Sequence, residues 1–431
     1  MNYLYFFINI LLVAFFCYKL RLIGRGYLSA PGIYLGLSVL PTFTLLFPSE
    51  YASFEGRAGI GDYSLSLILH TGFMGVGLFA AYFIFNNARL PKRKFVLGPD
   101  SVVNEYRFVF NSALLLSFGS LLSQILILGD IPILSVFQSG DVVDLTNARE
   151  SGYKLQESPV VYLWHFSRMV FIPFVVIASF IRYKIRPSKR SLLLFLGVLL
   201  FGIVHNSLSG AVAPVAMLFL CIGVAYIYVL GRIRLSLVAP FVVLIFVFPF
   251  LVEYAYSEDA FLDTLFYFSY KVINRFSFET FDRTLSYFDY FPYVKDYLGG
   301  RTNGLFMLFT GNEYFNVQNY IFLERLESFR EHLLHGSANA HFIGYMNADF
   351  GLVGVGVSCL FVGIIIGLLD IVASKNIEGP AGLALYVVMG FIFWKLMGSQ
   401  PTSVLFSHGA ILCCLLIWVQ KRIRVKSLRR I

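Results

Sequence analysis

Long apolar runs separated by short basic segments make up most of this chain. Several runs reach roughly 20 residues, the length that an α-helix needs to cross a hydrocarbon core about 30 Å thick. The runs are continuous rather than alternating, which excludes a transmembrane β-barrel. The pattern predicts spans at residues 2–18, 28–48, 63–85, 107–128, 159–181, 191–207, 211–230, 235–252, 350–373, 380–398 and 404–420. We therefore expect an all-α fold, a polytopic membrane helix bundle of about 11 transmembrane helices, forming a single integral membrane domain over residues 1–431.

Two longer segments interrupt this pattern, at residues 129–158 and 253–340. The second contains 23 Phe and Tyr residues, too many for a disordered segment because such side chains must be buried. Its residues 260–291 and 324–331 have helix-like apolar spacing. We expect a smaller loop and a large helical loop, with helices that lie on the membrane surface and roof a cavity between the spans.

Composition agrees with a membrane protein. The mean hydropathy is +0.73, with 58% hydrophobic and 14% charged residues, which lies outside the range of soluble globular proteins. All five cysteines fall inside apolar runs, so neither a disulfide framework in the loops nor a Cys/His metal cluster is expected. Residues 1–18 lack a basic segment ahead of the apolar run, so no cleavable signal peptide is expected.

The net charge of +9 is distributed unevenly between the two sides of the predicted membrane. Of the 34 Lys and Arg residues, 22 gather between alternate apolar runs, accompanied by four acidic residues. The two sides therefore carry about +18 and about −9, as the positive-inside rule describes. This predicts a cytoplasmic C-terminus, an external N-terminus and two external loops. It also accounts for the basic charge without nucleic acid as a partner.

Arginines on the external side are candidates for binding pyrophosphate, because a guanidinium holds phosphate oxygens in a bidentate manner. They are Arg149, Arg168, Arg275, Arg283 and Arg301. Arg168 lies inside the fifth span, where a charge costs about 2.5 kcal/mol or more unless it is paired or faces a cavity. His165 lies one turn earlier on the same face, so the two are expected to point into the bundle together. The alternatives are a packing role for Arg168, and surface ion pairs of Glu279 with Arg275 and Arg283.

A second group of candidates lies where the large loop meets the next span, in residues 339–356. His341, Tyr345 and Asp349 recur every four residues, which places an imidazole, a phenol and a carboxylate on one helical stripe. Such groups at the membrane boundary can take a proton from a sugar hydroxyl or orient it. The alternative is a capping residue above a packing seam of small residues. His205, near the outer end of another span, is more typical of a satisfied interior histidine.

No Walker loop, HExxH, GxSxG or DxD motif occurs in the external loops. The exterior of a cell lacks ATP and nucleotide sugars. A synthetic reaction there needs a substrate that is already activated and lipid-linked, such as a glycan on undecaprenyl pyrophosphate. The bundle could bind its prenyl tail, the arginines its pyrophosphate, and the aromatic side chains of the large loop its sugars.

At this point the chain resembles the bacterial O-antigen polymerases, within the broader group of oligosaccharide repeat-unit polymerases. The resemblance covers the overall plan and, more specifically, residues 339–356, with the acidic-aromatic-glycine step Asp349-Phe350-Gly351. The related O-antigen ligases carry a similar run after a histidine. The resemblance therefore favours a polymerase, with an O-antigen ligase as the alternative. A flippase or other transporter of lipid-linked oligosaccharides is a third hypothesis.

The resemblance implies a membrane-integral glycosyltransferase that needs no metal or other cofactor. It would polymerise undecaprenyl-pyrophosphate-linked oligosaccharides at the periplasmic face of the bacterial inner membrane and release undecaprenyl pyrophosphate. Asp349 and His341 would be catalytic, the five arginines would bind pyrophosphate, and His165, Tyr345 and Asn339 would orient substrate. Expected partners are the lipid-linked substrate, membrane lipids, a chain-length regulator protein and a flippase.

Overall fold

The computed structural model describes residues 2–24, 27–45, 59–85, 107–128, 159–208, 213–231, 250, 261–273, 280–325, 338–377 and 379–428. Within these residues the regular secondary structure is helical, apart from a two-residue antiparallel pairing of β1 (Ile23–Gly24) with β2 (Tyr27–Leu28). Seven of its helices are long and apolar enough to cross a membrane. Two shorter apolar helices accompany them, at Tyr3–Lys19 and Pro214–Leu230. This confirms the all-helical class, and the long apolar helices are consistent with a membrane protein; the number of about 11 spans stays a prediction.

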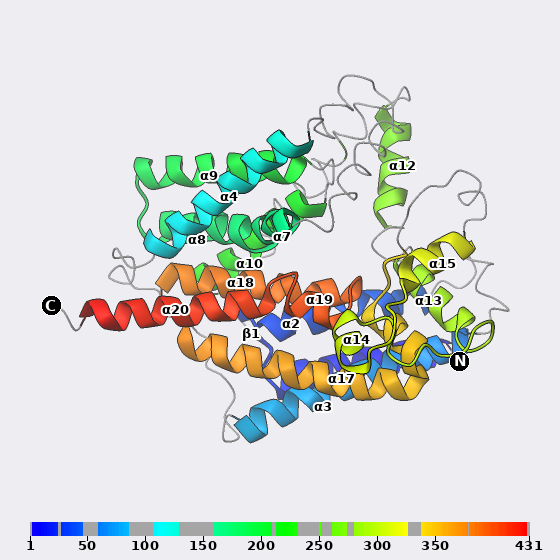
Figure 1. Cartoon of the computed structure of the whole chain (residues 1–431). Helices are drawn as coiled ribbons and strands as arrows, with labels where there is room; N and C mark the ends of the chain where they lie inside the picture. Colours follow the sequence, from blue (N-terminus) through cyan, green and yellow to red (C-terminus); the bar gives the residue numbers. More distant parts are fainter. Residues whose placement is uncertain are drawn as a thin grey trace.

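The long helices form two groups that lie side by side (Figure 1). One group contains α4 (Arg107–Leu128), α7 (Pro159–Phe166), the π-helical turn η4 (Ser167–Phe171), α8 (Ile172–Ile185), α9 (Lys189–Ser207) and α10 (Ala213–Leu230). The other contains α1 (Asn2–Lys19), α2 (Ala30–Leu37), η1 (Leu40–Leu45), α3 (Ile60–Phe85), α17 (Phe342–Asn376), α18 (Gly379–Trp394), η6 (Lys395–Met397), α19 (Pro401–Leu405) and α20 (Ala410–Leu428). Helix α18, almost entirely buried, packs against both α8 and α10 and so joins the groups.

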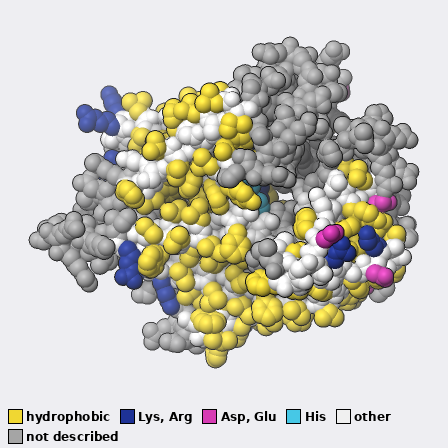
Figure 2. Space-filling model, viewed as in Figure 1, with side chains coloured by type: hydrophobic (Ala, Val, Ile, Leu, Met, Phe, Trp, Pro, Cys, Tyr) yellow, Lys and Arg dark blue, Asp and Glu magenta, His cyan; other side chains and the backbone are white. Residues whose placement is uncertain are grey.

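Four short helices of the predicted large loop are described: α12 (Phe261–Ile273), α13 (Thr280–Tyr290), α14 (Gly304–Thr310) and α15 (Val317–Arg325). Helices α13, α14 and α15 lie at the end of the bundle away from the C-terminus, which we call the loop end (Figure 1). The predicted loop at 129–158 lies outside the described residues. In Figure 2 the visible Lys and Arg side chains lie at the C-terminal end and also at the loop end, whereas the visible Asp and Glu side chains lie at the loop end.

The span expected over residues 28–48 is instead the eight-residue helix α2 followed by the 3-10 turn η1. Ser29 caps α2, because its side chain accepts a hydrogen bond from the Gly32 amide at 3.0 Å. Pro41 lacks the N–H that would donate to the Leu37 carbonyl, so the α-helical ladder ends at this point. Helix α2 is too short to cross a bilayer, and it is buried against α18 in the core.

Helices α3 and α17 cross closely because glycines face each other. A Cβ at Gly77 would lie 2.3 Å from the Leu360 carbonyl oxygen, and one at Gly363 would lie 2.4 Å from the Met74 oxygen. Small residues at such a crossing let two backbones approach within contact distance. The seam of small residues expected in α17 is therefore present, but it lies at Gly363, further along the helix than residues 351–356.

Asp370 is a fully buried carboxylate in α17 that ties three helices together. It accepts hydrogen bonds from Tyr82 of α3 at 2.8 Å and from Tyr386 of α18 at 2.5 Å. The Tyr386 oxygen also accepts from the Ala30 amide of α2 at 3.2 Å. Hydrogen bonds of this kind offset the cost of burying the acid, so we assign Asp370 a structural role in holding the helices together.

Candidate functional site

A group of basic side chains from three elements meets inside the bundle. It comprises His165 of α7, Arg168 of η4, Lys395 of η6 and His408, which follows α19; we call these four residues the basic cluster. His165 Nε2 and His408 Nδ1 are joined by a hydrogen bond of 2.5 Å. The charges of Arg168 and Lys395 act on each other, and both act on His165. All four side chains are half-buried.

The π-helical turn η4 positions Arg168. The Ile172 amide bonds to the Ser167 carbonyl, five residues earlier, which widens the helix by one residue at this point. Pro173 follows immediately and supplies no N–H to the regular ladder. Single π-turns inside α-helices occur frequently at functional sites. The charge of Arg168 acts on the His165 imidazole three residues earlier, so we assign both residues to the same cluster.

The segment from Lys395 to Gly409 brings the other two basic residues to this point. After α18 the chain makes the 3-10 turn η6 and the five-residue helix α19 before α20 begins. Gly409 has a φ of +92°, and a Cβ there would lie 2.6 Å from the Val170 side chain in η4. Only glycine permits both that conformation and that approach, which seats His408 against His165. His408 Nε2 also bonds to Ser399 Oγ at 3.2 Å.

Polar side chains of neighbouring helices extend the site. His205 of α9 is fully buried, and its imidazole interacts electrostatically with Arg168. His205 Nε2 and Ser120 Oγ of α4 are joined by a hydrogen bond of 3.2 Å. Trp164 donates its indole N–H to Ser123 of α4 at 2.8 Å, which fixes the start of this span. The structure therefore gives His205 a place beside the cluster that a lone histidine in the sequence does not reveal.

Asp349 lies at the loop end of α17 and holds the large loop in place. Its carboxylate accepts hydrogen bonds from the Thr302 amide at 3.1 Å and the Thr302 hydroxyl at 2.5 Å. The Gly299 amide donates to the Asp349 carbonyl at 2.9 Å. Gly351, two residues on, has non-helical angles and bends the helix. Burial and the nearby Asp349 carboxylate together raise the pKa of Tyr314.

Gln400 connects this anchor to the basic cluster. Its side-chain amide donates to the Thr302 carbonyl at 2.6 Å, and the residue before it, Ser399, bonds to His408. The path from Asp349 through Thr302 and Gln400 therefore reaches the segment that carries Lys395 and His408. The two groups of candidates predicted from the sequence, around Arg168 and around Asp349, are parts of one region at the loop end.

His341 and Tyr345 point to other partners than Asp349 does. His341 caps α17 by accepting from the Ile343 amide, and its ring lies against His70 with centroids 4.8 Å apart. Burial and His70 hold the pKa of His341 well below its usual range, so the imidazole is neutral. The Tyr345 hydroxyl accepts from Gln318 at 2.5 Å. Both residues thus pack the loop onto α17, while Asn339 is exposed.

The predicted arginines of the large loop are not part of the basic cluster as far as the structure describes them. Arg301 donates to the Glu313 carbonyl at 3.3 Å and lies over the Phe315 ring. Arg283 is half-buried on α13, where its charge acts on Tyr287. Arg149 and Arg275 lie outside the described residues, so their role stays a prediction.

Two members of the cluster were not proposed as site residues from the sequence. Lys395 is recognisable as a charge inside an apolar run, which is a signal of function in membrane segments. His408 falls in the predicted span 404–420, and its signal is the polar, proline- and glycine-bounded stretch from Ser399 to Gly409. Comparison of the chain with protein-family models, curated proteins and solved structures returned no match.

Proposed function

We propose that this protein is a glycosyltransferase that polymerises undecaprenyl-pyrophosphate-linked oligosaccharide repeat units at the external face of a bacterial inner membrane. The observation that carries the proposal is the basic cluster, formed by Arg168, Lys395 and the His165–His408 pair at the loop end of a membrane bundle. Two cations held close together repel each other, and a bound polyanion offsets that repulsion. A pyrophosphate presented by a membrane lipid is such an anion.

In the proposed reaction, a hydroxyl oxygen of one lipid-linked unit forms a bond to the anomeric carbon of a second lipid-linked glycan. The bond from that carbon to the pyrophosphate oxygen breaks, and undecaprenyl pyrophosphate leaves as an anion. Arg168 and Lys395 stabilise the negative charge that develops on the leaving oxygen, an electrostatic contribution that preorganised groups supply efficiently. The hydroxyl proton passes to a ring nitrogen of the hydrogen-bonded His165–His408 pair.

The sequence predicted Asp349 as a catalytic group. In this proposal Asp349 instead positions the large loop. Its carboxylate is engaged with Thr302, and Thr302 in turn accepts from Gln400. Asp349 therefore sets the position of the loop and of the segment that carries His408. His341 caps α17 from a buried place and contributes in the same indirect way.

The experiment that tests the proposal is incubation of the purified protein with purified lipid-linked repeat units, scored for polymer and for released undecaprenyl pyrophosphate. Arg168→Gln and Lys395→Gln should each lower the initial rate by about 10²–10³-fold, the usual cost of removing one charge-stabilising group. Arg190→Gln, at an exposed position of α9, is the matched control and should leave the rate unchanged. Normal rates in both cluster variants would contradict the proposal.

The alternative, an O-antigen ligase, uses the same donor and the same cluster but delivers the glycan to lipid A-core. A ligase would form no polymer from repeat units alone and would transfer glycan once lipid A-core is added. Deletion in cells separates the two again, because loss of a polymerase leaves single repeat units attached, whereas loss of a ligase leaves none.

A further inference from the structure

His165, His408 and Ser399 form one continuous chain of hydrogen bonds. His165 Nε2 is joined to His408 Nδ1 at 2.5 Å, and His408 Nε2 is joined to Ser399 Oγ at 3.2 Å. The three residues come from α7, from the stretch between α19 and α20, and from the turn between η6 and α19. Both ring nitrogens of His408 and one of His165 are therefore engaged within the protein. The other nitrogen of His165 is Nδ1.

Nδ1 of His165 is the ring nitrogen of the pair that a substrate can reach. In the part of the chain that the structure describes, no protein group is hydrogen-bonded to it. It is also not one of the buried polar atoms that lack a partner, so part of its surface is accessible. A general base must come within hydrogen-bond reach of the proton that it removes. Nδ1 can approach a substrate hydroxyl without the loss of a hydrogen bond in the protein.

The direction of the chain decides whether Nδ1 can accept a proton. When both rings are neutral, two arrangements are possible. In the first, Nε2–H of His165 donates to His408 and Nε2–H of His408 donates to Ser399 Oγ, which leaves Nδ1 of His165 bare. In the second, Ser399 Oγ–H donates to His408, His408 Nδ1–H donates to His165, and Nδ1 of His165 already carries a proton. The Nε2–H form is the more stable tautomer of free histidine, so the first arrangement gives both rings their preferred form.

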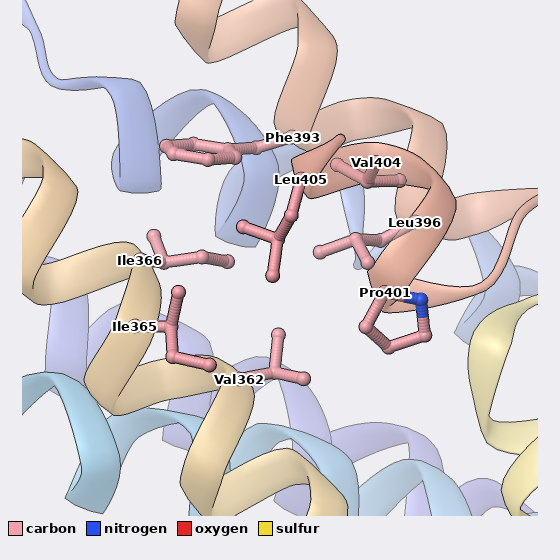
Figure 3. A pocket seen from close by; sticks show the side chains of 8 residues that line it. All are labelled: Val362, Ile365, Ile366, Phe393, Leu396, Pro401, Val404 and Leu405. Atoms are coloured by element: carbon pink, nitrogen blue, oxygen red, sulfur yellow. The ribbon is translucent and has the colours of Figure 1, made fainter. Parts of the chain in front are cut away.

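Contacts on both sides of Ser399 hold its backbone in place. The Gly398 amide donates to the Lys395 carbonyl at 2.9 Å, and the Gln400 side chain donates to the Thr302 carbonyl at 2.6 Å. Figure 3 shows the apolar side chains of the same stretch that face α17, and those of α17 that face them: Leu396, Pro401, Val404 and Leu405, and Val362, Ile365 and Ile366. A packed segment therefore presents Ser399 Oγ to the imidazole, which is the support that a positioning residue needs.

We propose that Ser399 is a positioning residue that holds the pair in the Nε2–H form, and that Nδ1 of His165 accepts the proton of the attacking hydroxyl. The inference rests on the proposed function, because that function supplies the hydroxyl. The O–H bond breaks, its proton binds Nδ1, and the oxygen forms the bond to the anomeric carbon. The Nε2 proton of His165 can then move to Nδ1 of His408, so that two rings share the positive charge. Sharing lowers the repulsion between the new imidazolium and Arg168, whose charge acts on His165.

Nitrogen-15 NMR of the full chain in lipid nanodiscs, labelled at histidine, tests the tautomers without any substrate. A ring nitrogen with a proton and one without differ widely in chemical shift, and the His165→Gln and His408→Gln variants identify the two rings. Both rings should show Nε2–H and a bare Nδ1. A spectrum with Nδ1–H on His165, or with both nitrogens of His165 protonated, would overturn the inference. Nδ1–H on both rings would mean that the Ser399 hydroxyl donates to His408, as in an activated serine nucleophile.

Ser399→Ala removes the acceptor of the His408 Nε2–H group, so Nδ1–H signals should appear in its spectrum. Its polymerisation rate should fall about 10-fold, because a lost hydrogen bond leaves only part of the pair in the accepting form. Ser399→Thr keeps the hydroxyl and should restore both the spectrum and the rate. Ser403→Ala in α19 is the matched control and should behave like the wild type, since Ser403 contacts His408 through its backbone carbonyl. An unchanged spectrum or an unchanged rate in Ser399→Ala would each refute the positioning role.

The NMR readout does not depend on polymer synthesis. The expected tautomers in a protein that makes no polymer would contradict the proposed function and leave the tautomer assignment in place. Polymer synthesis by a protein whose His165 carries Nδ1–H would do the reverse.

Discussion

At the scale of residues, the informative signal was a charge in an apolar run. Arg168 stood out in the sequence because an unpaired charge at that depth is costly, and the structure places it with His165 in one cluster. The same reasoning from the sequence does not identify His408 as the hydrogen-bond partner of His165. His408 lies 243 residues further along the chain, and no local periodicity connects the two positions. Contacts set by tertiary packing must come from coordinates.

The His165–His408 pair should behave as one unit in catalysis. His165→Ala and His408→Ala should each lower the polymerisation rate by about 100-fold, within the usual contribution of a positioned proton acceptor. The double variant should be no slower than about either single variant, because the second substitution removes a function that is already lost. Initial rates of the four proteins complete the cycle. Multiplicative losses would show that the two imidazoles act independently.

Asp349 offers a second test at this scale, because positioning and base catalysis predict different patterns. Thr302→Val removes the hydroxyl that donates to the carboxylate at 2.5 Å and keeps the shape of the side chain. Loss of one buried, charge-assisted hydrogen bond costs about 1.5–3 kcal/mol. If Asp349 positions the loop, Thr302→Val and Asp349→Asn should lower the rate to a similar extent, on the order of 10-fold.

Catalysis by Asp349 itself would give another result in the same rate assay. Asp349→Asn would then lose about 10²–10⁴-fold, while Thr302→Val would stay close to the wild type. Of the predicted stripe, Tyr345 and Asp349 lie on α17 as the spacing indicated, and His341 is the N-cap residue of that helix. What the spacing did not show is that each side chain is already engaged with a different part of the packed loop.

At the scale of elements, the apolar pattern located helices well and their interruptions poorly. The long runs give helices α3, α4, α9 and α17 close to the predicted places. The pattern missed the π-turn in the fifth span, placed the break between α18 and α20 at residues 399–403 only, and missed the shortness of α2. Each interruption contains or adjoins a proline, at positions 173, 401 and 41 respectively. A hydropathy average over many residues does not reveal a single proline. A proline nevertheless interrupts the helix, because it has no backbone N–H to donate.

The crossing of α3 and α17 provides a test of element packing. Gly363→Ala places a Cβ 2.4 Å from the Met74 carbonyl oxygen, so the backbones must move apart. Overpacking of this kind costs about 1–3 kcal/mol and should lower the melting temperature of the detergent-solubilised protein. Gly72→Ala on α3 is the control, since a Cβ there meets no atom within 4 Å. Equal melting temperatures for the two variants would contradict the packing described for this crossing.

At the scale of the whole molecule, the unequal distribution of charge is the property that the sequence describes best. In the part of the chain that the structure describes, the basic side chains visible in Figure 2 lie at both ends of the bundle, and the acidic ones lie at the loop end. The rule counts Lys and Arg near the ends of the spans, so it works without knowledge of any contact. The mutual placement of the two helix groups is different, because it depends on the shape of buried faces such as that of α18.

This polarity predicts the topology, and introduced cysteines can measure it. The native cysteines in the described part of the chain are all buried, which keeps background labelling low. Tyr293 is exposed at the loop end, and Lys189 is exposed at the start of α9, so each is suitable for replacement by cysteine. A thiol reagent that cannot cross membranes should label Tyr293→Cys in cells with a permeabilised outer membrane. It should label Lys189→Cys only after the inner membrane is disrupted, because the positive-inside rule assigns that basic end to the cytoplasm. The reverse pattern would place the basic cluster on the cytoplasmic half of the bundle, where nucleotide-activated sugars are available, and a lipid-linked donor would lose its rationale.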